Sequence, residues 1–204
     1  MAQSHREASR RALRICRAAA GLLHHEAGQG CRIRRKYTPL SWCGRELDSR
    51  ASRGIYRLAL FPAADRPDLV LWALWSRNRN EEVEGVYSHH TALSLYDLSD
   101  LNPAKLHMTV PTGFRRNSDI PGILVLHYFD LPATDVQTAQ GFKFTRPLRT
   151  ILDLIEVGTV ERNFIRQALR QAVDRGLITR QQIRNAQMSG PARKTVEGVL
   201  RRAA

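Results

Sequence analysis

The distribution of apolar residues changes abruptly at Gly54, and this change constrains the fold more than any other feature of the 204-residue chain. After Gly54, short apolar runs alternate with segments of helical period, whereas residues 1–53 show no sustained period of either kind. A periodic apolar face is what a helix or strand buries against its neighbours. The pattern therefore predicts a packed core that begins near residue 54.

Short apolar runs predict strands in the first half of this region. The run that ends at Tyr128 is apolar on both faces, which indicates a strand at the centre of a sheet. The predicted strands are Ile55–Phe61, Leu106–Val110, Ile123–Tyr128 and a shorter strand or hairpin arm at Gly141–Phe144.

Helix signals lie between and after these strands. Asp65 before Pro67 predicts the start of one helix, and Ser88 is the expected N-cap of a second helix that ends near Asp97. The predicted helices of the last third run from Pro147 (capped by Thr145) to Gly158, from Val160 to Arg175, from a Thr179/Gln182 capping box onward, and from Pro191 to Arg202. The predicted fold class is α/β (α+β): a small mixed sheet with flanking helices, a helical C-terminal third and a poorly structured N-terminal quarter.

Basic residues exceed acidic ones by 13, and most of this excess lies in residues 1–53, which hold twelve Lys or Arg and four Asp or Glu. The densest cluster is Arg32, Arg34, Arg35 and Lys36. Such a cluster binds nucleic acid through its phosphates, so these four residues are the predicted nucleic-acid-binding residues.

Metal, cofactor and membrane chemistry are not expected. Cys16, Cys31 and Cys43 match no zinc-binding spacing, and His24 with His25 cannot complete a tetrahedral site alone. No apolar stretch approaches the ~20 residues that cross a bilayer, and the N-terminus lacks the apolar region of a signal peptide. We therefore expect a cytoplasmic protein with no metal and no cofactor.

Two groups of polar residues have the composition of a reactive site. His89 and His90 follow Ser88, where the positive end of a helix favours a neutral imidazole that can act as a base. Arg149 and Asp153 are four residues apart on a predicted helix and can form an ion pair. No phosphate-binding loop, nucleophile elbow or metal motif accompanies them, which favours binding over catalysis, and no catalytic residue is assigned.

A basic stripe lies on the predicted helix after Val160. Arg162, Arg166 and Arg170 recur at intervals of four and therefore share one helix face. This face can meet phosphates or an acidic protein surface, or it can be a solvated face without a partner.

Several segments after Gly54 have a recognisable order and spacing. They are Gly54–Leu58 (GIYRL), Tyr87–Leu98 (YSHHTALSLYDL), His107–Pro111 (HMTVP), Gly141–Thr145 (GFKFT) and Arg149–Leu154 (RTILDL). This set resembles the AbiEi antitoxin family of bacterial type IV toxin–antitoxin systems, which act in abortive infection. In that family an N-terminal winged helix binds the operon's own promoter, and an α/β C-terminal domain is needed to counter the AbiEii nucleotidyltransferase toxin.

The resemblance implies an antitoxin and transcriptional regulator that is not an enzyme. Its partners would be promoter DNA and, as a functional antagonist, the toxin. The residues expected to form the family motif and the antitoxin surface are Ser88, His89, Ala92, Leu93, Arg149, Thr150 and Asp153, with the arginines Arg162, Arg166 and Arg170.

Residues 1–53 depart from the family, because they show neither the apolar period nor the turn of a helix-turn-helix. Codons that encode Asp48–Arg53 can, when shifted by one base, read Ile-Arg-Glu-His-Arg, which resembles the expected wing strand. We hypothesise that this segment is translated out of frame. Promoter binding is then expected to be weak or nonspecific.

The predicted organisation is a basic segment, residues 1–53, in place of the winged helix-turn-helix, followed by an AbiEi-like C-terminal domain at residues 54–204. Two other functions stay open. One is a nuclease or phosphotransfer enzyme that uses His89 or His90 with Arg149 and Asp153. The other is a generic basic nucleic-acid-binding protein.

Overall fold

A computed structural model describes residues 65–98, 100, 103–116 and 119–201, together with strands at 22–24, 47–52 and 55–58. The chain divides into two compact units, one of residues 1–84 with 138–142 and the other of residues 85–137 with 143–204. The predicted domain boundary at residue 54 stays a prediction.

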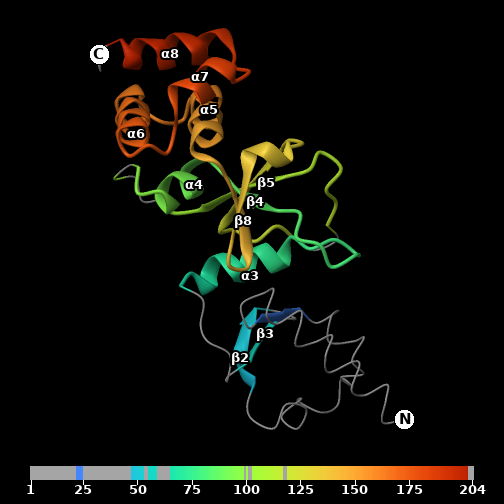
Figure 1. Ribbon diagram of the computed structural model, residues 1–204. Helices are drawn as coiled ribbons and strands as arrows, with labels where there is room; N and C mark the ends of the chain where they lie inside the picture. Colours follow the sequence, from blue (N-terminus) through green and yellow to red (C-terminus); the bar gives the residue numbers. More distant parts are fainter. Residues whose placement is uncertain are drawn as a thin grey trace. The chain divides into compact units, whose positions relative to one another are not determined.

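The first unit contains a three-stranded antiparallel sheet (Figure 1). Strand β3 (Ile55–Leu58) lies between β1 (Leu22–His24) and β2 (Leu47–Ser52). The sequence pattern indicates β3 but neither β1 nor β2, and residues 24–53 are expected to be loop or poorly packed structure. Residues 47–52 instead form β2, because backbone hydrogen bonds to a neighbouring strand can hold a segment whose own period is weak.

Helix α3 (Pro67–Trp75) also belongs to the first unit and begins at the predicted proline. Its N-cap residue is Arg66 rather than the predicted Asp65, and no side chain makes a capping hydrogen bond. A proline in the first turn needs no hydrogen-bond acceptor, so this helix can begin without a side-chain cap. Leu69 and Val70 are fully buried.

The second unit contains most of a five-stranded mixed sheet. Its strands, in spatial order, are β6 (Leu124–Tyr128), β5 (Leu106–Val110), β4 (Val86–Tyr87), β8 (Phe142–Thr145) and β7 (Val136–Ala139), the last preceded by a short 3₁₀ turn at Ala133–Asp135. The central strand β4 is antiparallel to β5 and parallel to β8, and β5 is parallel to β6. The predicted mixed α/β fold class is confirmed.

The strand predicted to be central, β6, lies instead at the edge of this sheet. Tyr128 is 53% exposed, and Ile123, just before the strand, is 42% exposed. A short apolar run does not by itself distinguish burial on both faces from exposed apolar side chains, which are common on protein surfaces.

Five helices complete the second unit: α4 (His89–Leu95), α5 (Pro147–Val157), α6 (Arg162–Asp174), α7 (Arg180–Asn185) and α8 (Gly190–Leu200). Gly158 ends α5 in the left-handed conformation at φ 67°, and Gly176 follows α6 at φ 70°. Both stop signals act as predicted, because glycine adopts positive φ without steric cost.

The predicted caps of these helices have different outcomes. Thr179 and Gln182 form the complete capping box of α7. Thr145 is not the N-cap of α5, which is Arg146. The Thr145 hydroxyl instead lies 2.7 Å from the Thr150 hydroxyl, in the protein interior. That internal bond takes the side chain away from the helix start.

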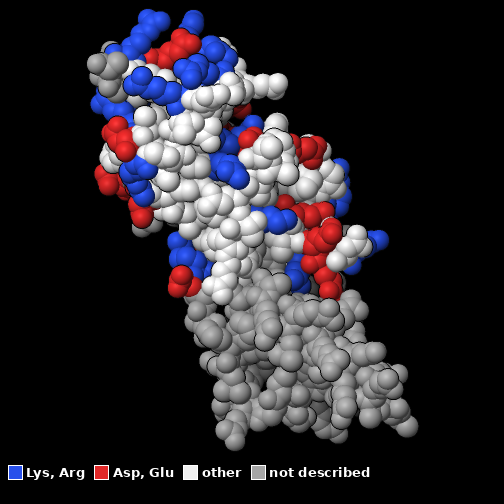
Figure 2. Space-filling model, in the orientation of Figure 1, with Lys and Arg blue, Asp and Glu red and all other residues white. Residues whose placement is uncertain are grey.

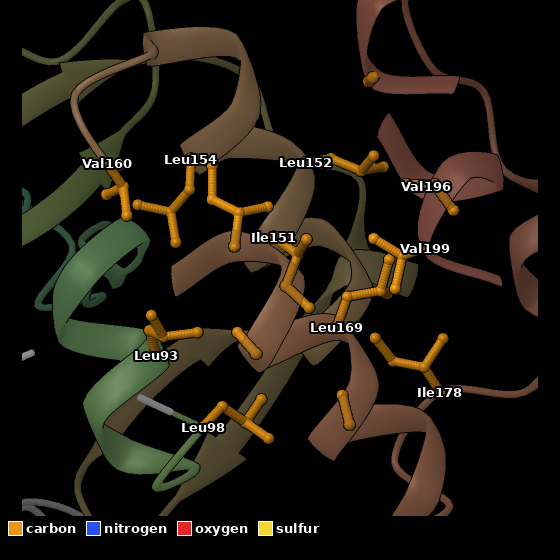
Figure 3. Packing of buried hydrophobic residues seen from close by; sticks show 14 of the residues in the cluster. Leu93, Leu98, Ile151, Leu152, Leu154, Val160, Leu169, Ile178, Val196 and Val199 are labelled. Atoms are coloured by element: carbon orange, nitrogen blue, oxygen red, sulfur yellow. The ribbon is translucent and has the colours of Figure 1, made fainter. Parts of the chain in front are cut away.

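A single apolar cluster joins α4 to the C-terminal helices (Figure 3). Ile151 and Leu169 lie in the middle of the cluster, with Leu93 of α4 on one side of them and Val196 of α8 on the other. The cluster consists of Leu93, Leu98, Ile151, Leu152, Leu154, Val160, Ile165, Ala168, Leu169, Ala172, Ile178, Ile183, Ala192, Val196 and Val199. The apolar stripe predicted on α6 is therefore one wall of this core.

Truncating a fully buried member of the cluster should cost far more stability than truncating an exposed one. We expect Leu169→Ala to lower the free energy of unfolding by about 2–5 kcal/mol, since it leaves a cavity. Val157→Ala, at a residue 45% exposed, should change it by less than about 0.5 kcal/mol. Urea unfolding followed by circular dichroism measures both, and equal losses would contradict the assigned core.

Candidate functional site

A cluster of four histidines lies where α4 meets the sheet of the second unit. His89 and His90 begin α4, His107 lies on β5, and His127 lies on β6. The β5–β6 register pairs Thr109 with His127, so these side chains and that of His107 share one face of the sheet. The rings of His89 and His127 stack with centroids 3.7 Å apart, and the ring of His90 lies 4.5 Å from that of His107.

A chain of short hydrogen bonds connects β5 to the start of α4. Thr109 Oγ1 donates to Ser88 Oγ at 2.7 Å, and Ser88 Oγ lies 2.8 Å from Nδ1 of His89. Because Ser88 accepts from Thr109, its own proton is directed to His89, and we assign the ring proton of His89 to Nε2. Ser88 occupies the predicted N-cap position, but its side chain makes no capping bond because it is committed to this chain.

The backbone at His89 is held in an uncommon conformation. Its φ is 51°, in the left-handed region that non-glycine residues rarely adopt. Such a conformation persists where surrounding contacts determine it. Here the stacked ring of His127 and the hydroxyl of Ser88 hold the imidazole.

Burial keeps the histidine cluster uncharged at neutral pH. Desolvation, with smaller contributions from the neighbouring imidazoles and Arg149, lowers the pKa of His89 to about 3. Desolvation likewise lowers the pKa of His107 to about 4. The pKa values of His90 and His127 are lowered chiefly for the same reason.

This arrangement is poorly suited to proton transfer. A general base works best when its pKa lies near the operating pH, far above the pKa of about 3 at His89. His89 is only 5% exposed and Ser88 is fully buried, so neither side chain reaches a substrate in this conformation. Ser88 and His89 are therefore better suited to positioning α4 on the sheet than to catalysis.

The predicted ion pair between Arg149 and Asp153 is present on α5, with Asp153 buried and Arg149 half-buried. Arg149 Nη2 lies 2.7 Å from Asp153 Oδ1, and the guanidinium carbon lies 4.5 Å from the centre of the Phe129 ring. Burial raises the pKa of Asp153 to about 6, although Arg149 opposes this. The carboxylate is thus ionised at pH 7. Its Oδ2 and Arg149 Nε have no hydrogen-bond partner among the described residues.

Most residues predicted to form an antitoxin surface lie in the interior, which corrects that expectation. At most 5% of each is exposed in the set Ser88, His89, Ala92, Leu93, Thr150 and Asp153. Sequence alone does not reveal this, because a polar residue can be buried when hydrogen bonds or an ion pair satisfy it. These residues hold elements together and cannot meet a partner directly.

The arginine stripe does face outward. Arg162 and Arg170 are exposed, and Arg166 is half-buried. Arg166 and Arg170 line a polar hollow of about 480 Å³ on α6. The predicted nucleic-acid-binding residues Arg32, Arg34, Arg35 and Lys36 lie outside the described residues.

The sequence did not indicate three residues of this site: His107 and His127 of the histidine cluster, and Thr109, which binds Ser88. His107 and Thr109 lie in the HMTVP segment of the resemblance, but neither they nor His127 show a spacing that by itself indicates a site. The parallel register of β5 and β6 places His127 beside Thr109, and the packing of α4 on these strands brings His89 onto His127.

The four clustered histidines do not converge on a common point. Throughout the described part of the chain, no group of three or more His, Cys, Asp or Glu residues is arranged to hold a metal ion. Two of the imidazoles stack face to face rather than directing nitrogens to one centre.

None of the helices among the described residues combines the length and the apolar character needed to span a membrane.

No protein-family model matches the chain, and no curated protein matches it.

Replacing His89 should alter how stability depends on pH. A histidine with a lowered pKa destabilises the folded state as pH falls below about 6.5, because only the unfolded state binds the proton. Asp153 has a raised pKa, so its protonation below about pH 6 stabilises the folded state. The effect of His89 is therefore measured as the difference between wild type and a variant that keeps Asp153. Asn tolerates positive φ and offers an acceptor for Ser88. When the pH falls from 7 to 4.5, the free energy of unfolding of wild type should decrease by about 2–3 kcal/mol more than that of His89→Asn. Urea unfolding at both pH values measures this, and parallel losses would contradict a buried neutral imidazole.

Removing Arg149 should leave a buried carboxylate without its partner. We expect Arg149→Ala to destabilise the protein by about 3 kcal/mol at pH 7. The loss should be smaller at pH 5, where Asp153, with a pKa of about 6, is protonated. The matched control is Arg162→Ala, at an exposed position on α6. Thermal or urea unfolding measures both, and a loss that does not depend on pH would argue against the ion pair.

Proposed function

We propose that the chain is an antitoxin and transcriptional regulator of a bacterial type IV toxin–antitoxin system, which counters an AbiEii-type nucleotidyltransferase toxin in the cytoplasm. The observation that carries this proposal is that separate segments of the AbiEi resemblance interlock. Ser88 in the second segment binds Thr109 in the third. Tyr96 in the second donates to the backbone oxygen of Thr145 in the fourth at 3.0 Å.

These contacts support the proposal because segments that pack against one another in one buried network are expected to occur as a set, with the same order and spacing along the chain. Residues 87–98, 107–111, 141–145 and 149–154 all contribute to the same fold through α4, β5, β8 and α5. A chance resemblance of short segments does not require such mutual contacts.

The enzymatic alternative is less well supported. His89, Arg149 and Asp153 are gathered in one region, since the guanidinium influences the titration of both other groups. They are largely buried, however, and the imidazole is too weak a base for efficient proton transfer at neutral pH. A binding function needs neither access to these groups nor their titration.

The regulatory part of the proposal is promoter binding, which we expect to be weak or nonspecific. The net charge of +13 supports phosphate contacts, while the pattern of a recognition helix is missing from residues 1–53. A generic nucleic-acid-binding protein would share this property but would have no effect on the toxin.

Growth rescue tests the proposal. The full chain is expressed in bacteria that also carry, under an inducible promoter, a gene for an AbiEii-type nucleotidyltransferase toxin. We expect growth to be restored by wild type and reduced with Arg162→Glu/Arg170→Glu, which reverses the charge of the exposed stripe. The matched control Arg79→Glu/Lys105→Glu makes the same change of net charge at other exposed positions and should retain rescue.

Failure of the wild-type chain to restore growth, despite soluble expression, would reject the antitoxin proposal. Equal rescue by the two charge-reversed variants would leave the antitoxin role but exclude the α6 stripe from it.

A further inference from the structure

An apolar groove of about 340 Å³ lies between α7 and α8. Ile183 and Val196 are buried in its floor, and the half-buried Met188 and Leu200 complete it. These side chains come from both helices and from the short link between them. The groove is therefore built on packed elements that also belong to the main apolar cluster. Its size and floor suit a small number of aliphatic side chains.

The rim of the groove is basic. Arg180, Arg184, Arg193 and Arg201 line it and are exposed, and Glu197 is the single acidic residue among its lining residues. None of the four arginines forms an ion pair with a described residue. Figure 2 shows blue side chains crowded over α7 and α8, at the top of the view, around a red acidic group. The surface thus combines an apolar floor with an excess of positive charge.

We propose that this groove docks an amphipathic helix of a protein partner, whose apolar side chains enter the groove and whose flanking carboxylates meet the arginines. A helix laid into an apolar groove is a recurrent mode of peptide recognition. Arginine binds carboxylates in a bidentate geometry that gives both strength and orientation.

Other occupants fit this surface less well. A second copy of the same groove would set arginines against arginines. A nucleic acid would meet the arginines but would leave Met188 and Leu200 uncovered. The proposal goes beyond the proposed function, because it requires only the chemistry of this surface and not the identity of the partner.

Fluorescence anisotropy with the full chain tests the proposal. The probe is a labelled helical peptide with Leu at i, i+3, i+4 and i+7 and Glu beside them. Two control peptides carry Gln in place of every Glu, or Ser in place of every Leu. We expect the acidic apolar peptide to bind about tenfold more tightly than either control, a difference of about 1.4 kcal/mol. Its affinity should fall as salt rises, because charges on the rim contribute.

Variants locate the binding site. Arg184→Glu/Arg193→Glu should weaken binding by about tenfold, whereas the matched reversal Arg162→Glu/Arg170→Glu on α6 should leave it nearly unchanged. Met188→Ser, in the floor, should weaken the Leu peptide without affecting the Ser control. Circular dichroism and unfolding confirm that each variant is folded.

Three results would overturn the proposal. The first is equal binding of the acidic peptide and its Gln control. The second is equal weakening by the two double reversals. The third is tight binding of a short DNA duplex that is lost in Arg184→Glu/Arg193→Glu while the peptide is unaffected, which would make the groove a nucleic-acid surface.

Discussion

The hydrogen bond from Thr109 to Ser88 connects the sheet to α4, and the second unit depends on it. Both residues are at most 3% exposed, so a lost partner would leave a buried hydroxyl unsatisfied at a cost of about 1–3 kcal/mol. The bond sets where α4 begins, which in turn brings His89 onto His127 and carries Leu93 into the apolar cluster. This polar contact thus lies between the histidine cluster and the part of the core to which Leu93 belongs.

The interior of this unit contains two polar groups with opposite responses to acid. The histidine cluster is neutral at pH 7 and destabilises the fold when it must accept protons, whereas protonation of Asp153 relieves the cost of a buried carboxylate. The two effects partly offset each other between about pH 6 and 4. Such a balance reduces the change in the stability of this unit over that pH range.

The surface has a different character from this interior. Exposed arginines gather on α6 and around the α7–α8 groove, while the resemblance motifs that seem polar in sequence are largely buried. The motifs therefore build the framework, and the arginines are what a partner would meet. This division supports a binding protein with acidic partners, and it separates residues that affect folding from residues that affect recognition.

Local sequence determined the features that depend on neighbours along the chain. The apolar period specified α6, the Thr179–Gln182 pair specified a helix start, and the spacing of Arg149 and Asp153 specified an ion pair. Only the tertiary structure decided that Asp153 of this pair is buried, that β6 lies at a sheet edge, and that Ser88 turns from its cap position to His89. The physical reason is that burial, strand order and competition between hydrogen-bond partners depend on segments far apart in sequence, such as the parallel pairing that brings His127 beside Thr109.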